Sequence, residues 1–491
     1  MKEKQDLLSY IRDGRPMTRN EKIKLIVQLS IPSILAQISA TVMFFIDYAM
    51  VGHLGENATA SVGLVESTTW LMGGLGSAVN LGFSVQVAHY IGAKDFEAAQ
   101  RVLRQSLVCA FLWALMLSLI GIIIHQQLPF WLGGSDAIAP DASMYFMIIC
   151  LGGFFFQMEG LGGSMLKCSG NMRIPSALNI MMCVLDVTFN YFFIYQLNMG
   201  VKGAAMGTAM AELITAAMML YFLLWRSDML GIFRGVRSMK TRRSNNSQFL
   251  RPFGSKRAKL ERSVLSSQLK LFRPSYDVVK MAFKIGAPMG LQHLLMGSAQ
   301  VVSTIIVAPL GTVAIAANSM AITVESLCYM PGFGIAEAAT TLVGQAIGAG
   351  QRLLTRSLAF ISVGLGISVM SVMGVLMFVF APELMAFLSP VDAIVQEGAQ
   401  ALRIEAFAEP MFAASIVANG VFIGAGDTLK PAIMSLSSMW GIRLSLAALM
   451  APRYGLKGVW IAMAIDLTCR GIIFLLRLVK GNWNKQLVKD S

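Results

Sequence analysis

Two aspartates stand inside long apolar stretches of the sequence, where a charged side chain is unexpected. Asp47 lies about twenty residues into the stretch 26–50, and Asp186 lies about twelve residues into 174–196. An ionised side chain near the middle of a lipid bilayer costs at least about 2.5–3.5 kcal/mol. Both carboxylates are therefore candidates for binding a proton or Na⁺. Two simpler interpretations stay open: Asp47 could lie in water at a helix end, and Asp186 could have a purely structural role.

Polar residues accompany Asp186 on one face of its predicted helix. Asn179 precedes it by seven residues and Asn190 follows it by four, and both are helical spacings. Carboxylate and amide oxygens are ligands of hard cations, and the same pocket also suits the uptake and release of a proton. The expected ion-coupling site therefore contains Asp47, Asp186, Asn179 and Asn190. We expect no metal site beyond Na⁺ at the two aspartates.

Further acids lie in predicted membrane segments, and we treat them as secondary candidates for lining a cavity. Glu159 and Glu212 belong to the first half of the chain. Three glutamates of the second half lie about ten to fifteen residues from the predicted outer face, opposite Arg443 and the i, i+4 pair Asp466 and Arg470. Buried acids and bases at similar depth neutralise one another, so we expect mainly structural ion pairing from these three: Glu325, Glu405 and Glu409.

The composition indicates a membrane protein. Hydrophobic residues make up 55% of the 491 residues and charged residues 14%, whereas globular domains carry about a quarter charged residues. These values exclude a cytosolic enzyme, a nucleic-acid-binding module and a disulfide-stapled secreted domain. The six cysteines show no CxxC or CxxH spacing, and the four histidines form no metal-binding motif. We therefore expect neither an enzyme nor a cofactor.

Twelve apolar segments are long enough to cross a bilayer as helices, which need about 20 residues each. They fall into two sets of six, separated by one long polar segment. The predicted fold is an all-α membrane protein with twelve transmembrane helices in two pseudo-symmetric six-helix lobes. The predicted helices cover residues 26–50, 60–88, 105–126, 143–166, 174–196, 203–226, 279–308, 313–347, 355–381, 393–424, 430–451 and 456–478.

The polar segment carries most of the formal net charge of +13. From Arg226 to Lys280 there are 14 Lys or Arg residues and 3 acids, and by the positive-inside rule this connector is cytoplasmic. Six spans precede it, so both termini are expected in the cytoplasm too. The connector could be regulatory, but its Ser, Arg and Lys content is typical of a flexible linker. The expected organisation is a tail at 1–24, a lobe at 25–226, the connector at 227–277, a lobe at 278–480 and a tail at 481–491.

The two sets of helices are copies of one another. Prolines and glycines recur at a single offset of 256 residues, and one further pair follows at 255. Because each half has an even number of helices, the halves are parallel repeats, a plan of transporters that bind substrate between two lobes. The matching pairs are Pro32/Pro288, Gly55/Gly311, Gly92/Gly348, Gly170/Gly426, Pro175/Pro431 and, at 255, Gly203/Gly458.

Short strings along both halves suggest a family. The run 46–55, IDYAMVGHLG, is followed by ASVGL at 60–64. Together these strings resemble the first helix and loop of the MATE (multidrug and toxin extrusion) transporters. The resemblance extends from about Lys24 to Gly481 and rests on five more segments: 88–93, Gly170-Asn171 with Pro175, 203–205 with Thr208, 341–350, and 424–428 with Pro431.

The resemblance implies a secondary active multidrug efflux transporter. Such a protein exchanges amphiphilic or cationic organic compounds for H⁺ or Na⁺ by alternating access, without a cofactor. It would be a monomer in a bacterial or archaeal plasma (inner) membrane, closer to the DinF-like or archaeal type than to NorM. Two alternatives stay open: a lipid-linked oligosaccharide flippase of the same superfamily, and a non-transporting membrane receptor.

The resemblance also assigns residues to the ion site. Thr208 matches a threonine of the sixth helix that contributes a hydroxyl to this site, although it could simply bond to its own backbone. Four residues before the aspartate of helix five, the family commonly has an asparagine, whereas this chain has Met182. This departure weakens the Na⁺ interpretation unless Asn179 or Asn190 takes that place.

Overall fold

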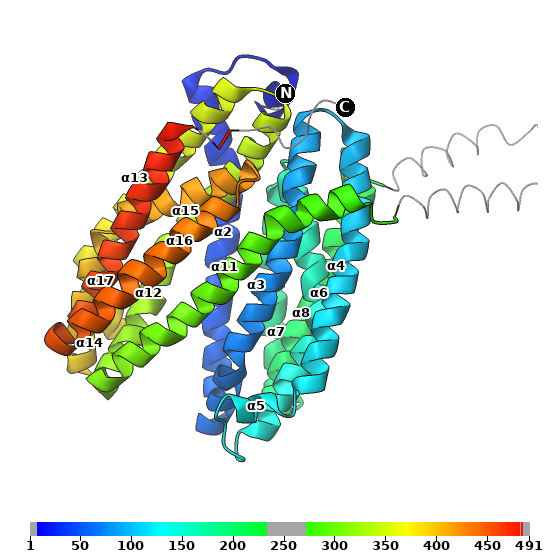
Figure 1. Cartoon of the computed structure of the whole chain (residues 1–491). Coiled ribbons are helices and arrows are strands. Elements are labelled where there is room, and N and C mark those ends of the chain that lie inside the picture. The colour runs from blue at the N-terminus through cyan, green and yellow to red at the C-terminus, as the bar shows by residue number, and fades with distance from the viewer. Residues whose placement is uncertain (1–6, 233–271, 482, 485–491) are drawn as a thin grey trace, which may run out of the picture.

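The computed structural model of the protein describes residues 7–232, 272–481, 483 and 484. These residues are almost entirely helical (Figure 1). The predicted connector at 227–277 and both predicted tails lie partly outside the described residues. After the short helix α1 (Leu7–Asp13), the first lobe contains α2 (Arg19–Gly52), α3 (Glu56–Gly92), α4 (Phe96–Ile124), α5 (Leu128–Trp131), α6 (Ala139–Cys168), α7 (Arg173–Tyr191), the π-helical turn η1 (Phe192–Gln196), α8 (Val201–Tyr221) and a second π-helical turn η2 (Phe222–Arg226).

The second lobe repeats this order with a few changes. Its third helix runs unbroken for 37 residues, and its fourth is divided into two parts. The elements are α11 (Tyr276–Val307), the 3₁₀ turn η3 (Ala308–Leu310), α12 (Thr312–Gly348), α13 (Arg352–Leu388), α14 (Asp392–Ala406), α15 (Glu409–Gly424), α16 (Leu429–Ser438), the π-helical turn η4 (Met439–Leu444) and α17 (Ser445–Lys480).

Polar residues fix where the membrane helices begin. Thr18 caps α2: its hydroxyl accepts from the Glu21 backbone N–H at 3.3 Å, and the Glu21 carboxylate accepts from the Thr18 N–H at 2.8 Å. This reciprocal capping box satisfies two N–H groups that the first turn of a helix leaves without partners. Asp95 caps α4 in a similar way, through Ala98 N at 2.9 Å.

Ten described helices are long and apolar enough to cross a membrane, and a bent pair makes eleven. One of the ten, Leu429–Lys480, has 52 residues, which corresponds to about 78 Å of helix against a hydrocarbon thickness of about 30 Å. Gly455 interrupts it with φ 60° and ψ −144°, and Figure 1 shows α16 and the end of α17 running in opposite directions. This segment therefore crosses twice, and the described part of the chain has the twelve predicted passes.

The tenth predicted helix, 393–424, is wrong as a continuous helix. The chain bends by 60° between α14 and α15. Pro410 is the second residue of α15. Proline has no N–H to donate to the preceding turn and its ring crowds that turn, so a helix breaks there.

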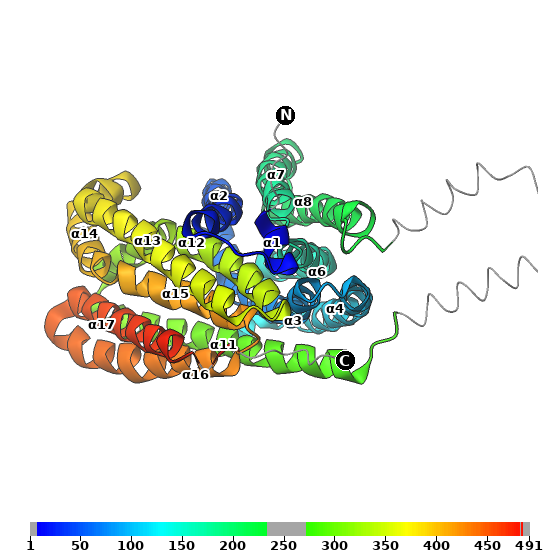
Figure 2. The same cartoon turned by 90° about the horizontal axis from the view of Figure 1, so that it is seen from above.

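The repeat is present in the backbone. The glycines before the second helix of each lobe have matching conformations, with φ 109° at Gly55 and φ 100° at Gly311. Before the sixth helix of each lobe, Gly200 and Gly455 have φ 57° and 60°. Residues with a side chain rarely adopt these angles. Figure 2 shows the two groups of helices from above, with α13, α14 and α17 on one side and α4, α6 and α8 on the other.

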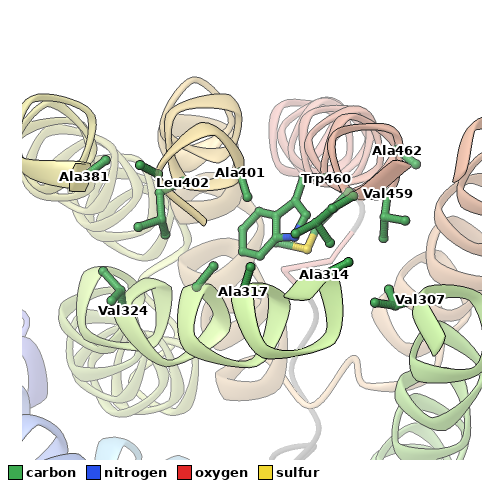
Figure 3. Packing of buried hydrophobic residues seen from close by; sticks show 14 of the residues in the cluster. Val307, Ala314, Ala317, Val324, Ala381, Ala401, Leu402, Val459, Trp460 and Ala462 are labelled. Atoms are coloured by element: carbon green, nitrogen blue, oxygen red, sulfur yellow. The ribbon is translucent and has the colours of Figure 1, made fainter. Parts of the chain in front are cut away.

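Each lobe packs around its own apolar core. In the second lobe the indole of Trp460 lies between alanines of α12 and α14, among them Ala317 and Ala401 (Figure 3). Trp460 is 1% exposed, and its Nε1 donates to Asn318 Oδ1 at 3.0 Å. Small residues on the neighbouring helices make room for this large ring.

The lobes meet where α3 crosses its repeat counterpart α12. A Cβ atom added to Gly92 would lie 2.0 Å from Gln345 O, and one added to Gly348 would lie 2.0 Å from His89 O. His89 and Gln345 are separated by the same 256 residues as the two glycines, so the pseudo-twofold axis passes through this contact. Helix α1 and the last turns of α17 lie at this same end of the molecule (Figure 1).

Candidate functional site

Asn190 joins the two predicted aspartates. Its Nδ2 donates to Asp47 Oδ1 at 2.9 Å and to Asp186 Oδ2 at 3.0 Å. Asp47 comes from α2, while Asp186 and Asn190 lie one turn apart on α7. Asp186 is fully buried and Asn190 is 1% exposed. The structure therefore gathers three predicted site residues into one cluster.

Helix α8 closes the cluster from another side. The side chain of Thr208 interacts with the Asp186 carboxylate, so this fourth predicted residue also belongs to the cluster. A Cβ atom added to the preceding residue, Gly207, would lie 2.0 Å from Asn190 Oδ1. Helices α7 and α8 therefore approach this closely only because residue 207 has no side chain. The sequence analysis did not identify Gly207, although it lies four residues after Gly203 in a segment rich in small residues.

The cluster has the oxygen atoms that a proton or a hard cation needs. Asp186 Oδ1 and Asn190 Oδ1 are buried and have no hydrogen-bond partner in the described residues. The carboxylates of Asp47 and Asp186 repel one another when both are charged. Two carboxylates, an amide oxygen and a hydroxyl form a donor set that fits Na⁺, and a bound proton would relieve the same repulsion. Within the described ranges, no group of three or more His, Cys, Asp or Glu side chains is arranged to hold a metal ion.

Asn179 does not join this cluster. With its amide nitrogen placed as the donor, it bonds to Glu159 Oε1 at 3.0 Å and to Pro175 O at 2.9 Å. Seven residues of helix separate Asn179 from Asp186, about 10 Å along the axis. The two residues share a helix face, as predicted, but they are too far apart to share one ion.

The secondary candidates Glu159 and Glu212 lie between this cluster and the closed end of the lobes. Glu212 is 5% exposed and interacts electrostatically with both Glu159 and Asp186. Glu159 in turn interacts with Lys167 and Glu337. The first lobe therefore contains a succession of ionisable groups rather than a single isolated site.

Lys167 and Glu337 connect the two lobes. Lys167 Nζ on α6 lies 2.9 Å from both carboxylate oxygens of Glu337 on α12. Ser33 and Gln37 of α2 also donate to this carboxylate, Gln37 Nε2 at 3.2 Å. The sequence analysis did not identify this pair. The signal that was missed is a second acid, Glu337, in the predicted membrane helix that also contains Glu325.

The glutamates of the second lobe behave differently from the prediction. Glu405 and Glu409 are fully buried on either side of the α14–α15 bend. Neither carboxylate has a hydrogen-bond partner in the part of the chain that the structure describes. Arg443 acts on Glu325 and Glu405 only at longer range. The expected direct ion pairing of the three glutamates is therefore not found in the described residues.

One predicted ion pair of this lobe is present. Arg470 Nη2 bonds to Asp466 Oδ2, and the Ser438 hydroxyl donates to Asp466 Oδ1. Asp466 is fully buried and Arg470 is 7% exposed. Arg470 is thus paired directly with Asp466, and it acts on Glu405 only as a longer-range electrostatic partner.

The family of the chain follows from its two lobes. The sequence profile of the MatE family matches residues 32–192 and 288–449. The matched ranges begin at Pro32 and Pro288, so each covers most of one repeat. The chain belongs to the MatE family. This result confirms the resemblance described above, and it confirms that this MatE protein is a multi-pass membrane transporter and not an enzyme.

Relatives of known sequence extend over nearly the whole MatE chain. The probable multidrug resistance protein NorM of Thermotoga maritima is 24% identical over 475 residues, covering 95% of this chain and 94% of its own. The uncharacterized transporter YisQ of Bacillus subtilis is 23% identical over 443 residues, covering 89% and 90%.

Solved structures show the same fold. A crystal structure of MATE in complex with MaL6 matches with a TM-score of 0.84 at 20% identity, covering 97% of this chain and 99% of that one. A MOP superfamily transporter from Pyrococcus furiosus matches with a TM-score of 0.83 at 20% identity, covering 97% and 98%. This MatE protein therefore has the two-lobed architecture predicted from its repeat.

Proposed function

We propose that this MatE protein is an antiporter that exports amphiphilic, cationic organic compounds in exchange for H⁺ or Na⁺. The observation that carries the proposal is the amide of Asn190, which holds the partly buried Asp47 and the buried Asp186 in one cluster. A pair of carboxylates inside a membrane helix bundle is costly unless it binds something. The names of the Thermotoga and Bacillus relatives, a multidrug resistance protein and a transporter, agree with export.

The cluster connects ion binding to helix position because its members come from three helices. Asp47 lies on α2, Asp186 on α7 and Thr208 on α8. A proton or Na⁺ bound there draws the three helices together, and its release lets the charged carboxylates separate. In this scheme substrate binds only when the carboxylates are free, so ion entry expels it.

Alternating access follows from where the lobes touch. They are in contact at the α3–α12 crossing and at the Lys167–Glu337 pair. Opening that end and closing the opposite one would expose substrate to the other side of the membrane. With the basic connector in the cytoplasm, the contact end and both termini face the cytoplasm of a bacterial or archaeal plasma membrane. We place the protein, acting as a monomer, in the DinF-like branch of the family.

Dye efflux from proteoliposomes tests this function and the choice of ion. Purified protein is reconstituted with ethidium inside the vesicles, and a pH gradient and a Na⁺ gradient are imposed separately. We expect one gradient to drive efflux and the D47N and D186N variants to lose at least about 95% of it. Efflux by these variants at the wild-type rate would exclude the aspartates as the coupling site. No gradient-driven efflux from wild-type vesicles would exclude an antiporter.

A further inference from the structure

Outside the ion-coupling cluster, the first lobe carries one acidic side chain enclosed by aromatic rings. Glu66 of α3 accepts a hydrogen bond from Tyr48 Oη of α2 and another from Trp70 Nε1, the latter at 3.2 Å. The ring of Phe44 lies with its centroid 5.3 Å from that of Tyr48 and 5.8 Å from that of Trp70. Three rings and one carboxylate therefore form a compact group, which we call the Glu66 cage.

The Glu66 cage lies on helix faces that point toward the other lobe. On α3, residues 66, 70, 74 and 78 follow one another at intervals of four, so each shares a face with the next along a row that turns by about 40° per step. At the inner part of this face, a Cβ atom on Gly74 would lie 3.1 Å from His293 Cβ of α11, and Ala78 O lies 2.6 Å from a Cβ atom built on Gly286. Further out, α11 runs away from α3 (Figure 1), and Trp70 is 65% exposed.

Helix α2 shows the same pattern. At its inner part, Ser33 and Gln37 bond to Glu337 of the second lobe. Phe44 and Tyr48 continue this face outward by two and three turns, beyond those contacts. The Glu66 cage therefore lies where the two lobes are separated. The same sides of α2 and α3 contact the second lobe nearer the closed end.

The equivalent place in the second lobe is hollow. Adding 256 residues to Phe44, Tyr48 and Glu66 gives Gln300, Thr304 and Ile322. These three residues line a pocket of about 280 Å³ between α11 and α12, together with Asn318 and Ser319. The repeat thus presents an accessible recess at this position in one lobe and an aromatic, acidic group in the other.

The depth of the cage rules out two simpler roles. Trp70 is fourteen residues from Glu56, the first residue of α3, which is about 21 Å along the helix. An aromatic residue that anchors a helix at the membrane surface lies near the helix end. A carboxylate at such depth that only faced lipid would cost at least about 2.5 kcal/mol. Both observations favour a side chain that faces a ligand.

We propose that the Glu66 cage binds the positive charge of a lipophilic organic cation, at a place distinct from the Asp47–Asp186 cluster. Aromatic faces attract cations that have no hydrogen-bond donors, such as quaternary ammonium groups. Tyr48 and Trp70 each use one lone pair of Glu66, and a carboxylate offers about four, so the charge stays available. This inference rests on the proposed function, since it names a substrate subsite of the proposed exporter.

Separate carboxylates for substrate and ion have a chemical consequence. The two sites are near one another, since Tyr145 interacts electrostatically with Glu66 as well as with Asp47 and Asp186. A cation held at Glu66 therefore lowers the affinity of the nearby aspartates for an incoming ion by electrostatic repulsion, and the ion does the same to the substrate. Antiport requires that substrate and ion weaken one another's binding. Electrostatic repulsion achieves this even when the two bind to different carboxylates.

Equilibrium binding to the purified full-length protein tests the proposal. Ethidium is the cationic probe, and Nile red is an uncharged aromatic probe. We expect E66Q to raise the Kd for ethidium at least about tenfold and W70A to raise it about fivefold, whereas W70F, which keeps an aromatic face, raises it less than threefold. The Kd for Nile red should change less than twofold in all three. Two matched controls, E56Q at the start of α3 and W131A, whose indole is also 65% exposed, should leave both Kd values unchanged.

The outcomes separate this inference from the function it rests on. Wild-type Kd values for ethidium in E66Q would overturn the proposal, and so would an equal loss of ethidium and Nile red binding, which indicates a structural defect. If wild-type protein exports ethidium and E66Q exports it equally well, the proposed role of the Glu66 cage is rejected and the proposed export function is kept. If no gradient drives export but ethidium binding depends on Glu66, the proposed antiport is rejected and the proposed binding site is kept. Melting temperatures within about 2 °C of wild type verify that the variants are folded.

Discussion

In the first lobe Asn190 bridges the buried Asp186 and the partly buried Asp47, whereas in the second lobe Glu405 and Glu409 are buried without hydrogen-bond partners in the described residues. The repeat allows equivalent positions of the two lobes to be compared directly. Asp47 corresponds to Ser303 at the offset of 256. Two copies of one backbone plan have thus kept their glycines and diverged in their buried polar residues. We propose that the coupling chemistry belongs to the first lobe and that the shared glycines Gly92 and Gly348 serve the contact between the lobes.

Substitution of the acids in the two lobes should have the largest and most unequal effects. In D47N or D186N, loss of the charge removes the ion site, and we expect gradient-driven ethidium efflux to fall at least about twentyfold. In E405Q and E409Q the shape of the side chain is kept and no hydrogen bond seen in the described residues is lost, so efflux should fall less than threefold. Initial rates in proteoliposomes measure both. Equal losses of efflux in the first-lobe and second-lobe variants would contradict the assignment of coupling to the first lobe.

The next largest effect is expected at Gly207. In G207A the new methyl group would meet Asn190 Oδ1 at 2.0 Å, so Asn190 must move and the aspartates lose their bridge. We expect efflux to fall about tenfold, with little change in protein yield. In the second lobe, G441A is the matched control, since a Cβ atom there has no neighbour within 4 Å. Normal efflux by G207A would show that the bridge is dispensable.

The crossing of α3 and α12 should respond symmetrically. In G92A and in G348A the added methyl group would lie 2.0 Å from a backbone oxygen of the other helix. Such overpacking costs about 1–3 kcal/mol, so each variant should lower the melting temperature in detergent by a similar amount. G364A, with open space around its Cβ position, is the control. A loss confined to one glycine would contradict a shared axis.

The ion pair between the lobes should have the smallest effect. Lys167 and Glu337 side chains are 19% and 29% exposed, and partly exposed pairs are worth about 1 kcal/mol or less. We expect K167M and E337Q each to slow efflux about two- to threefold, because the lobes separate more readily at this end. The charge swap K167E with E337K should restore part of the rate. If the swap is worse than either single change, the pair does not act as a simple contact.

Sequence reasoning found the fold because its signals are long and repeated. Each of three signals involves many residues at once: the apolar segments of membrane length, the basic connector, and the glycine pairs at one offset. The α14–α15 bend was missed because Pro410 is near the middle of an apolar run, where a proline can also be tolerated. The break at Gly455 was placed correctly, since the turn at 452–455 contains both Pro452 and Gly455.

The site was found less completely, because its contacts join distant helices. Type and depth selected Asp47 and Asp186, helical spacing selected Asn190, and the family resemblance selected Thr208. The structure brings these four residues together. Spacing along α7 could not tell Asn190, which bridges the aspartates, from Asn179, which bonds to Glu159.

Other partners left no local signal in the sequence. Glu337 has its partners 170 and 304 residues away, in Lys167 and Ser33. The close approach of α7 to α8 depends on the missing side chain of Gly207, which looks like any other small residue of a membrane helix.

The release of ions on substrate binding tests most directly whether coupling belongs to the first lobe. Purified protein in weakly buffered detergent solution is mixed with ethidium, and the protons released, or the ²²Na⁺ released from preloaded protein, are counted per molecule bound. We predict equal release from wild type and from the E405Q/E409Q double variant, and none from the D47N/D186N double variant. Release that persists without the two aspartates and disappears without the two glutamates would contradict the assignment.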